Sequence, residues 1–246
     1  MLFVAPCAPL VAQGATAAIA DGDVAHARYD SRGALDAYML ALESDSTSYE
    51  ALWKASRDAA DLGQATPDDD AREALYQQAT DFARRAVAAR DDDAEGHFAL
   101  ARALGLRALS VGPRARVKYA TEVRAEALRA LAIDSLHPGA LHVMGVWNAE
   151  VMRLNGFTRF FAKNVLGGKV FDEASWENAV RYMERAVAVD PQRLTHRLDL
   201  GMIYLDTDQK AKAREMFESV VNGARSDVND PAYKRDAERE LRELDG

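Results

Sequence analysis

The feature that most restricts the fold of this chain is a repeat whose spacing is constant in one part and variable in another. Its markers are alanine or valine residues, Ala41, Ala86, Ala130, Ala186 and Val220, at intervals of 45, 44, 56 and 34 residues. An apolar residue and a small residue follow each of the first four markers after 14 and 15 positions: Ala55-Ser56, Leu100-Ala101, Met144-Gly145 and Leu200-Gly201. This constant spacing predicts helix pairs with insertions inside some of them.

The residues before each marker follow the second-helix pattern of tetratricopeptide arrays, whose period is 34 residues. Small or aromatic residues stand seven and three positions before the marker, as Ala34 and Tyr38 do before Ala41. Small residues let two helices approach closely, and larger ones fill the space at the next turn. We therefore predict an all-α fold, a right-handed α-solenoid of about five tetratricopeptide-like helix pairs. Tyr233, Ala237, Leu241 and Leu244 form one stripe after Asp230-Pro231, which predicts a C-terminal capping helix.

The N-terminal segment differs from the rest of the chain. Residues 1–17 are mostly apolar and end in small residues, which is typical of an export-signal remnant, with a disordered N-terminus as the alternative. We expect the mature chain to begin near Ala15 or Ala18 and to be exported, either periplasmic or associated with the cell envelope. Residues 18–246 then form a single domain with a helical insertion at about 150–174, and no other apolar run is long enough to span a bilayer.

Charge and motifs exclude several classes of function. The net charge of −8 argues against a nucleic-acid partner, since phosphate binding needs a basic surface. His137 and His142 are five residues apart with a proline between them, so they do not form a zinc pair on one helix face. No phosphate loop or dinucleotide fingerprint is present in the sequence. We expect a non-enzymatic, monomeric binding protein without catalytic residues, metal or cofactor.

The first helix of each pair lines the inner face of such an array. Positions 12 and 16 residues after the markers form two inner rows: Trp53, Phe98, His142 and Leu198, then Arg57, Arg102, Val146 and Met202. A soluble protein rarely exposes so much apolar surface without a use, so we expect a ligand or an insertion to cover it. Burial of these side chains against one another is the alternative. Trp53 and Arg57 replace the Lys and Asn of carboxylate clamps, which argues against a carboxylate-binding cochaperone.

The longest insertion contains a short amphipathic helix. Phe157, Phe160 and Phe161 recur at helical spacing opposite basic residues, and Gly167-Gly168 ends the helix. The phenylalanines are suited to line a cavity, to act as a lid, or to make a peripheral membrane contact through 157–166. An aromatic plug that completes the core is the alternative.

Several segments resemble one protein family. These are His137 to Trp147, the aromatic and basic insertion, Trp176-Glu177-Asn178-Ala179 and the Asp190-Pro191 repeat end. Together they resemble the regulator of microtubule dynamics family over roughly residues 25–246, as a bacterial-type exported homologue. The resemblance implies a short tetratricopeptide array, and one member of that family binds phospholipid in its array and moves it between membranes.

The apolar inner row and the resemblance together predict that the concave face binds an amphipathic ligand, either a lipid or a fatty acyl chain. The apolar part would contact Trp53, Phe98, Val146, Leu198 and Met202, and His142 lies in the same row. Arg57, Arg102 and Arg153 would meet a phosphate or carboxylate head group. The alternative is a protein-interaction scaffold that binds an apolar helix or peptide in the same groove.

Overall fold

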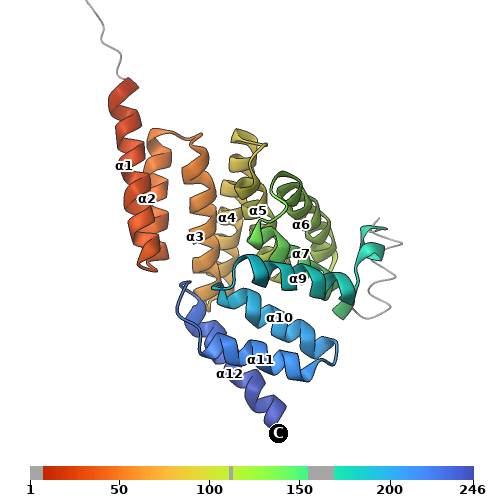
Figure 1. The fold of residues 1–246 in the computed structure, drawn as a ribbon. Helices are drawn as coiled ribbons and strands as arrows, with labels where there is room; N and C mark the ends of the chain where they lie inside the picture. The colour runs from red at the N-terminus through yellow and green to blue at the C-terminus, as the bar shows by residue number, and fades with distance from the viewer. Residues whose placement is uncertain (1–7, 111–112, 155–168) are drawn as a thin grey trace, which may run out of the picture. The chain divides into compact units, whose positions relative to one another are not determined.

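The computed structural model describes residues 8–110, 113–154 and 169–246 of the 246-residue chain, and within them every regular element is a helix. This confirms the predicted all-α class. The helices in Figure 1 are α1 (Ala8–Ala27), α2 (Ser31–Ser44), α3 (Tyr49–Ala65), α4 (Asp69–Ala89), α5 (Ala94–Ser110), α6 (Pro113–Ile133), α7 (Pro138–Arg153), the 3-10 helix η1 (Lys169–Glu173), α9 (Trp176–Val189), α10 (Leu194–Asp206), α11 (Lys210–Val221) and α12 (Asp230–Asp245).

The chain divides into two compact units, residues 1–103 and 104–246, with the boundary inside α5. In the first unit, α1 packs on α2, α2 on α3, and α3 on α4. In the second unit, α6 packs on α7, α7 on α9, α9 on α10, and α10 on α11 (Figure 1). Consecutive helices are therefore neighbours, as expected for an array of helix pairs.

The marker residues lie where the two helices of a pair meet. All five markers are fully buried. A Cβ added to Gly22 of α1 would lie 2.4 Å from the Tyr38 ring, and one added to Gly201 would lie 2.5 Å from the Phe217 ring. Tyr38 and Phe217 each stand three residues before a marker. The structure thus confirms that small residues on one helix receive large residues of the other.

At two of the markers, Ala86 and Ala186, the arginine directly before the marker links neighbouring repeats. Arg85 of α4 donates to the backbone carbonyl of Ser46 over 2.7 Å, and Arg185 of α9 donates to that of Ser135 over 3.3 Å. Both carbonyls belong to the turn that follows the second helix of the preceding repeat. Such a bond fixes the turn that joins one repeat to the next. This agrees with the constant spacing of 14 and 15 residues after each of the first four markers.

In the first unit the extra residues lengthen the helices, because only residues 66–68 separate α3 from α4. Asp68 caps α4 by accepting from the Ala71 amide over 2.8 Å. The longest insertion follows α7 and precedes α9, and residues 155–168 of it lie outside the described part of the chain, so its predicted helix stays a prediction. The C-terminal end of this insertion is attached to α7 by two contacts. The Phe171 ring stacks on Trp147 with centroids 6.0 Å apart, and the Ser175 amide donates to Asn148 Oδ1 over 3.2 Å.

Helix α12 closes the second unit at its C-terminus. Ala237 is fully buried in the core, and Tyr233, Leu241 and Leu244 pack against it, which confirms the predicted capping helix. Asn229, not Asp230, holds the N-cap position of this helix. The buried Asp230 carboxylate instead accepts from the Ser226 and Asp227 amides over 2.6 and 2.8 Å, which ties down the preceding turn.

The N-terminal helix begins at Ala8, inside the segment predicted as an export-signal remnant or a disordered N-terminus. Ala15 and Ala18 are both buried, so the expected start of the mature chain lies within a continuous, packed helix. Residues 1–7 lie outside the described part of the chain, and export stays a prediction. None of the helices that could be searched is both long and apolar enough to cross a membrane.

Candidate binding groove between helices α3 and α5

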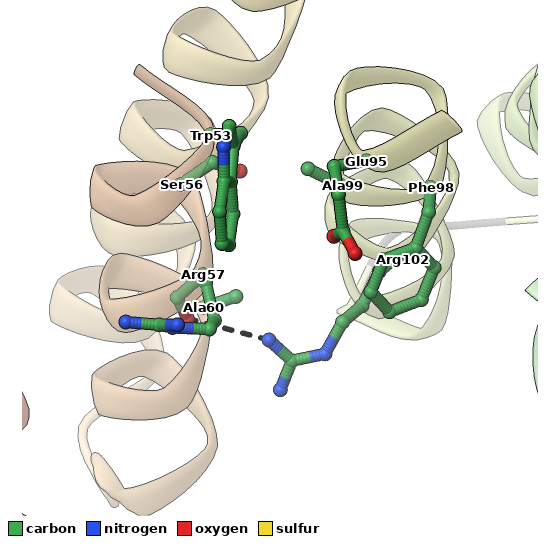
Figure 2. Close-up of a pocket in the computed structure, with 8 residues that line it drawn as sticks. All are labelled: Trp53, Ser56, Arg57, Ala60, Glu95, Phe98, Ala99 and Arg102. Atoms are coloured by element: carbon green, nitrogen blue, oxygen red, sulfur yellow. Dashed lines mark hydrogen bonds between the residues drawn. The ribbon is translucent and has the colours of Figure 1, made fainter. Parts of the chain in front are cut away.

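The first unit contains a groove between α3 and the N-terminal part of α5. Figure 2 shows Trp53 on the α3 side and Phe98 on the α5 side, both half-buried. Small residues between the two rings leave a hollow of about 290 Å³, including the solvent at its mouth. Its lining consists of Trp53, Ser56, Arg57 and Ala60 from α3, and Glu95, Phe98, Ala99 and Arg102 from α5. The groove therefore has two aromatic walls over a narrow floor.

Arg102 spans the groove from α5 to α3. One of its nitrogens donates to the backbone carbonyl of Arg57 over 3.3 Å, as drawn in Figure 2. Another donates to Asp61 over 2.5 Å and to Gln64 over 2.9 Å. The Asp61 side chain is only 3% exposed, so its charge is buried and needs a partner. Arg102 supplies that partner.

Arg57 is held in a similar way on the other side of α3. Its guanidinium donates to Asp58 over 2.8 Å and to the Tyr38 hydroxyl over 3.2 Å. The Asp58 side chain is fully buried, and its other oxygen lies 2.8 Å from His26 Nδ1 of α1. Helix α1 therefore contributes to the polar network behind the groove, although it does not line the hollow.

Two cations flank the Trp53 ring. Lys54 Nζ lies 5.6 Å and the Arg57 guanidinium carbon 5.4 Å from the ring centroid, within reach of a cation–π interaction. Lys54 also donates to Asp23 of α1 over 2.7 Å. Burial alone would raise the pKa of Asp23, but the hydrogen bonds from Lys54 and Tyr38 hold it below its usual value. The indole is thus held between side chains that are themselves fixed.

The same network contains three groups of the kind that bind metals. Ligand atoms of His26, Asp58 and Asp61 lie within 4.8 Å of one another, which makes them the one such group found in the described residues. Asp58 is paired with Arg57 and Asp61 with Arg102. A divalent cation placed among them would face two guanidinium groups. The residues therefore form an ion-pair network that orients the arginines, and they do not suit a cation.

A family model for the regulator of microtubule dynamics protein 1-3 matches residues 18–245. The chain belongs to this family. No curated protein sequence matches it. Among solved structures it is similar to the thermophilic tetratricopeptide protein TTC0263 of Thermus thermophilus, with 17% identity and a TM-score of 0.66 over 92% of this chain and 99% of that one. It is also similar to pilF of Pseudomonas aeruginosa, with 15% identity and a TM-score of 0.55 over 95% and 88%.

These likenesses show the fold of this regulator of microtubule dynamics family member. They confirm the tetratricopeptide architecture and the resemblance noted in the sequence. Four predicted site residues meet in the groove: Trp53, Arg57, Phe98 and Arg102. The two inner rows of the sequence analysis therefore come together in the first unit.

In the second unit, the predicted inner-row residues are largely used for packing. Leu198 belongs to the core, and Val146 and Met202 are half-buried against it. This arrangement matches the alternative in which apolar side chains bury one another. His142 Nε2 lies 2.7 Å from Asp199 Oδ2, and its ring stacks on His196 at 4.8 Å.

The ring of His196 is buried, and its Nδ1 has no hydrogen-bond partner among the described residues. Burial, with a smaller contribution from the nearby charge of His142, lowers the pKa of His196 to about 2. The imidazole is therefore neutral at physiological pH. This pair of histidines lies at the contact between α7 and α10.

The remaining predicted residues surround the long insertion. Arg153 is exposed but lies 2.6 Å from Asp206 and 2.5 Å from Glu150. Burial alone would lower its pKa, but these carboxylates raise it. Arg153 therefore already has two anionic partners. Phe157, Phe160 and Phe161 lie outside the described residues, so their predicted role as a lid stays a prediction.

Sequence reasoning missed the carboxylates behind the groove. Asp58 and Asp61 stand three positions apart on a helix whose other buried residues are mostly apolar, and this spacing was the available signal. It also missed the small residues Ser56, Ala60 and Ala99, which create the hollow because they lack bulk. Their effect depends on which helix faces them, and the repeat pattern does not specify that.

Proposed function

We propose that this protein is a non-enzymatic interaction module that binds a peptide segment of a partner protein in the groove between α3 and α5. The observation that carries the proposal is the pair of half-buried aromatic rings, Trp53 and Phe98, in a groove whose other lining residues are small residues, two arginines and Glu95. Aromatic residues in partly desolvated pockets are the usual anchors of protein recognition. An apolar side chain of the partner would fill the hollow.

The size of the hollow favours a side chain over a whole lipid. Pockets that enclose drug-sized ligands hold roughly 300–1,000 Å³, whereas the comparable volume of this hollow is about 30 Å³. A lipid with two acyl chains needs more enclosed space than that. The lipid or fatty acyl ligand predicted from the sequence therefore becomes the alternative, supported by the apolar inner row and the family resemblance.

The charges of the groove also favour a peptide over an anionic head group. Arg57 and Arg102, which would have to hold the head group, each pair with a buried carboxylate. Releasing either arginine would leave that carboxylate buried without its partner, which is costly. The apolar walls carry no such cost, because contact with an apolar side chain removes only apolar surface from water.

A displayed peptide library selected on the purified protein tests the proposal. Fluorescence polarisation then measures the affinity of recovered peptides for the wild type, for Phe98→Asp in the groove, and for the control Leu40→Asp. Leu40 is 56% exposed on α2 and lies outside the lining. We expect Phe98→Asp to weaken binding by about 30-fold or more and the control to change it little.

A fluorescent phospholipid added to the same three proteins tests the alternative. Binding of the lipid that depends on Phe98, together with no enriched peptide, would overturn the proposal in favour of the lipid. Enriched peptides whose affinity is the same for wild type and Phe98→Asp would place the binding site elsewhere. Melting curves by circular dichroism show whether each variant remains folded.

A further inference from the structure

The cations at the groove are paired within the chain. Arg57 pairs with Asp58, Arg102 with Asp61, and Lys54 with Asp23 and Glu50. An anionic ligand would have to break one of these pairs, and Glu95 in the lining would also repel it. An uncharged ligand leaves all of the pairs intact, so the electrostatics favour an uncharged segment over an anionic one.

The recurring ways of recognising a peptide can be compared with this groove. Strand addition needs a sheet edge, and the described residues contain only helices. An α-helix with its side chains is about 10–12 Å across, and it needs a long trough where this chain has a hollow of about 290 Å³. Recognition of an acidic or phosphorylated motif needs arginines that are not already paired.

Of the modes compared, only recognition of a polyproline II segment is left. The groove has the main features that this mode needs. Proline-rich segments dock between aromatic side chains, and their rings insert into narrow apolar spaces. Trp53 and Phe98 provide the aromatic walls, and the Lys54 and Arg57 contacts hold the indole in place. A rigid wall favours a rigid ligand, because neither partner then loses much conformational freedom on binding.

The Trp53 side chain also carries a hydrogen-bond donor, its indole N–H. Its indole N–H makes no hydrogen bond to the described residues, whereas the Trp147 N–H donates to the Ala120 carbonyl over 2.7 Å. A polyproline II helix has no internal hydrogen bonds, so its carbonyls remain free to accept. An indole at the edge of an apolar groove is therefore matched to such a ligand.

We propose that the groove between α3 and α5 binds an uncharged, proline-containing segment in the polyproline II conformation. This inference rests on the proposed function, because it specifies the partner of the same groove. The anchor would be a proline or neighbouring aliphatic side chain between Trp53 and Phe98. Its carbonyl would accept from the Trp53 indole.

Fluorescence polarisation with two labelled, uncharged peptides tests this inference. One contains three Leu-Pro-Pro units, one unit for each turn of a polyproline II helix, and the other has alanine in place of every proline. We expect the proline peptide to bind about tenfold more tightly, because it is already ordered. Raising the salt from about 0.1 M to about 0.5 M should change its affinity less than about twofold, since no charge pair is involved.

Variants of Trp53 locate the binding site. Trp53→Ala removes the wall and should weaken the proline peptide about 30-fold. Trp53→Phe keeps an aromatic ring but removes the donor, and should weaken it about fivefold. Leu40→Ala on the exposed face of α2 is the control and should have no effect. Because Trp53→Phe preserves the packing, it tests the site even where Trp53→Ala melts early.

The outcomes separate this inference from the proposed function. Equal binding of the two peptides, with both weakened by Trp53→Ala, would overturn the polyproline inference and leave the peptide groove standing. The same conclusion would follow from a strong loss of affinity at high salt. Failure of both peptides to bind, with no groove-dependent peptide recovered from the library, would overturn both proposals.

Discussion

Gly201 of α10 is the position where the packing of a helix pair can be tested most directly. A Cβ added there would lie 2.5, 2.9 and 3.0 Å from three carbons of the Phe217 ring. Carbon atoms prefer separations of about 3.5–4.0 Å, so the ring would have to move by about 1 Å. Phe217 is fully buried and has no solvent to move into. We expect Gly201→Ala to strain the core of the second unit.

Two effects of opposite sign determine the size of the change. Replacing glycine by alanine inside a helix stabilises it by about 1 kcal/mol. Overpacking a filled core costs about 1–3 kcal/mol, occasionally more. The clash involves a fully buried ring, so we take the upper part of that range. Gly201→Ala should therefore lower the free energy of unfolding by about 1–2 kcal/mol.

Gly105 of α5 provides a matched control in the same unit, because a Cβ added there meets no atom within 4 Å. Gly105→Ala should show only the helix-propensity gain, about 1 kcal/mol of stabilisation. Urea denaturation followed by circular dichroism measures both variants against the wild type. If both substitutions stabilise the protein to the same extent, close approach of α10 and α11 at Gly201 is refuted.

Three further substitutions test other parts of the structure. Because the folded pKa of His196 lies below its unfolded value of 6.5, its contribution to stability is present above pH 6.5 and is lost as the pH falls toward about 2. At two pH units below 6.5, the loss in the free energy of unfolding is up to about 2.7 kcal/mol. His196→Gln should remove this part of the pH dependence when the free energy of unfolding is measured at decreasing pH. Asp58→Ala leaves the Arg57 guanidinium without its buried partner, and chemical denaturation should show a loss of about 3 kcal/mol; no loss would mean that the ion pair is unimportant. Arg185→Ala removes the bond to the Ser135 carbonyl, for which we expect about 1 kcal/mol of destabilisation, whereas an unchanged midpoint would argue against a link between repeats.

Much of the fold was predictable because its signals repeat. Close approach of two helices needs a small residue at a fixed position, and that requirement recurs at every marker, including Ala41 and Ala186. The turns between repeats recur as well. The insertions inside the pairs were inferred as departures from this spacing; between α3 and α4 the extra residues lengthen the two helices, which the spacing does not specify.

The candidate site was predictable only in part. The position of Trp53 and Phe98 on the inner row follows from counting along the repeat, and both line the groove. The same count assigned Leu198 to that row, yet in the second unit Leu198 is part of the core. Equivalent positions in a repeat therefore have different surroundings, because the side chains opposite them differ.

The sequence by itself determined the helix pairs, their register and the capping helix, since each depends on residues that are close along the chain or repeat at a constant distance. Only the tertiary structure decided which arginines are available to a ligand. The partner of Arg102 is Asp61, 41 residues earlier, and the carboxylate behind Arg57 also meets His26 of α1. Pairs of this kind depend on the three-dimensional meeting of particular side chains, which no repeat spacing encodes. They neutralise the two arginines that line the groove.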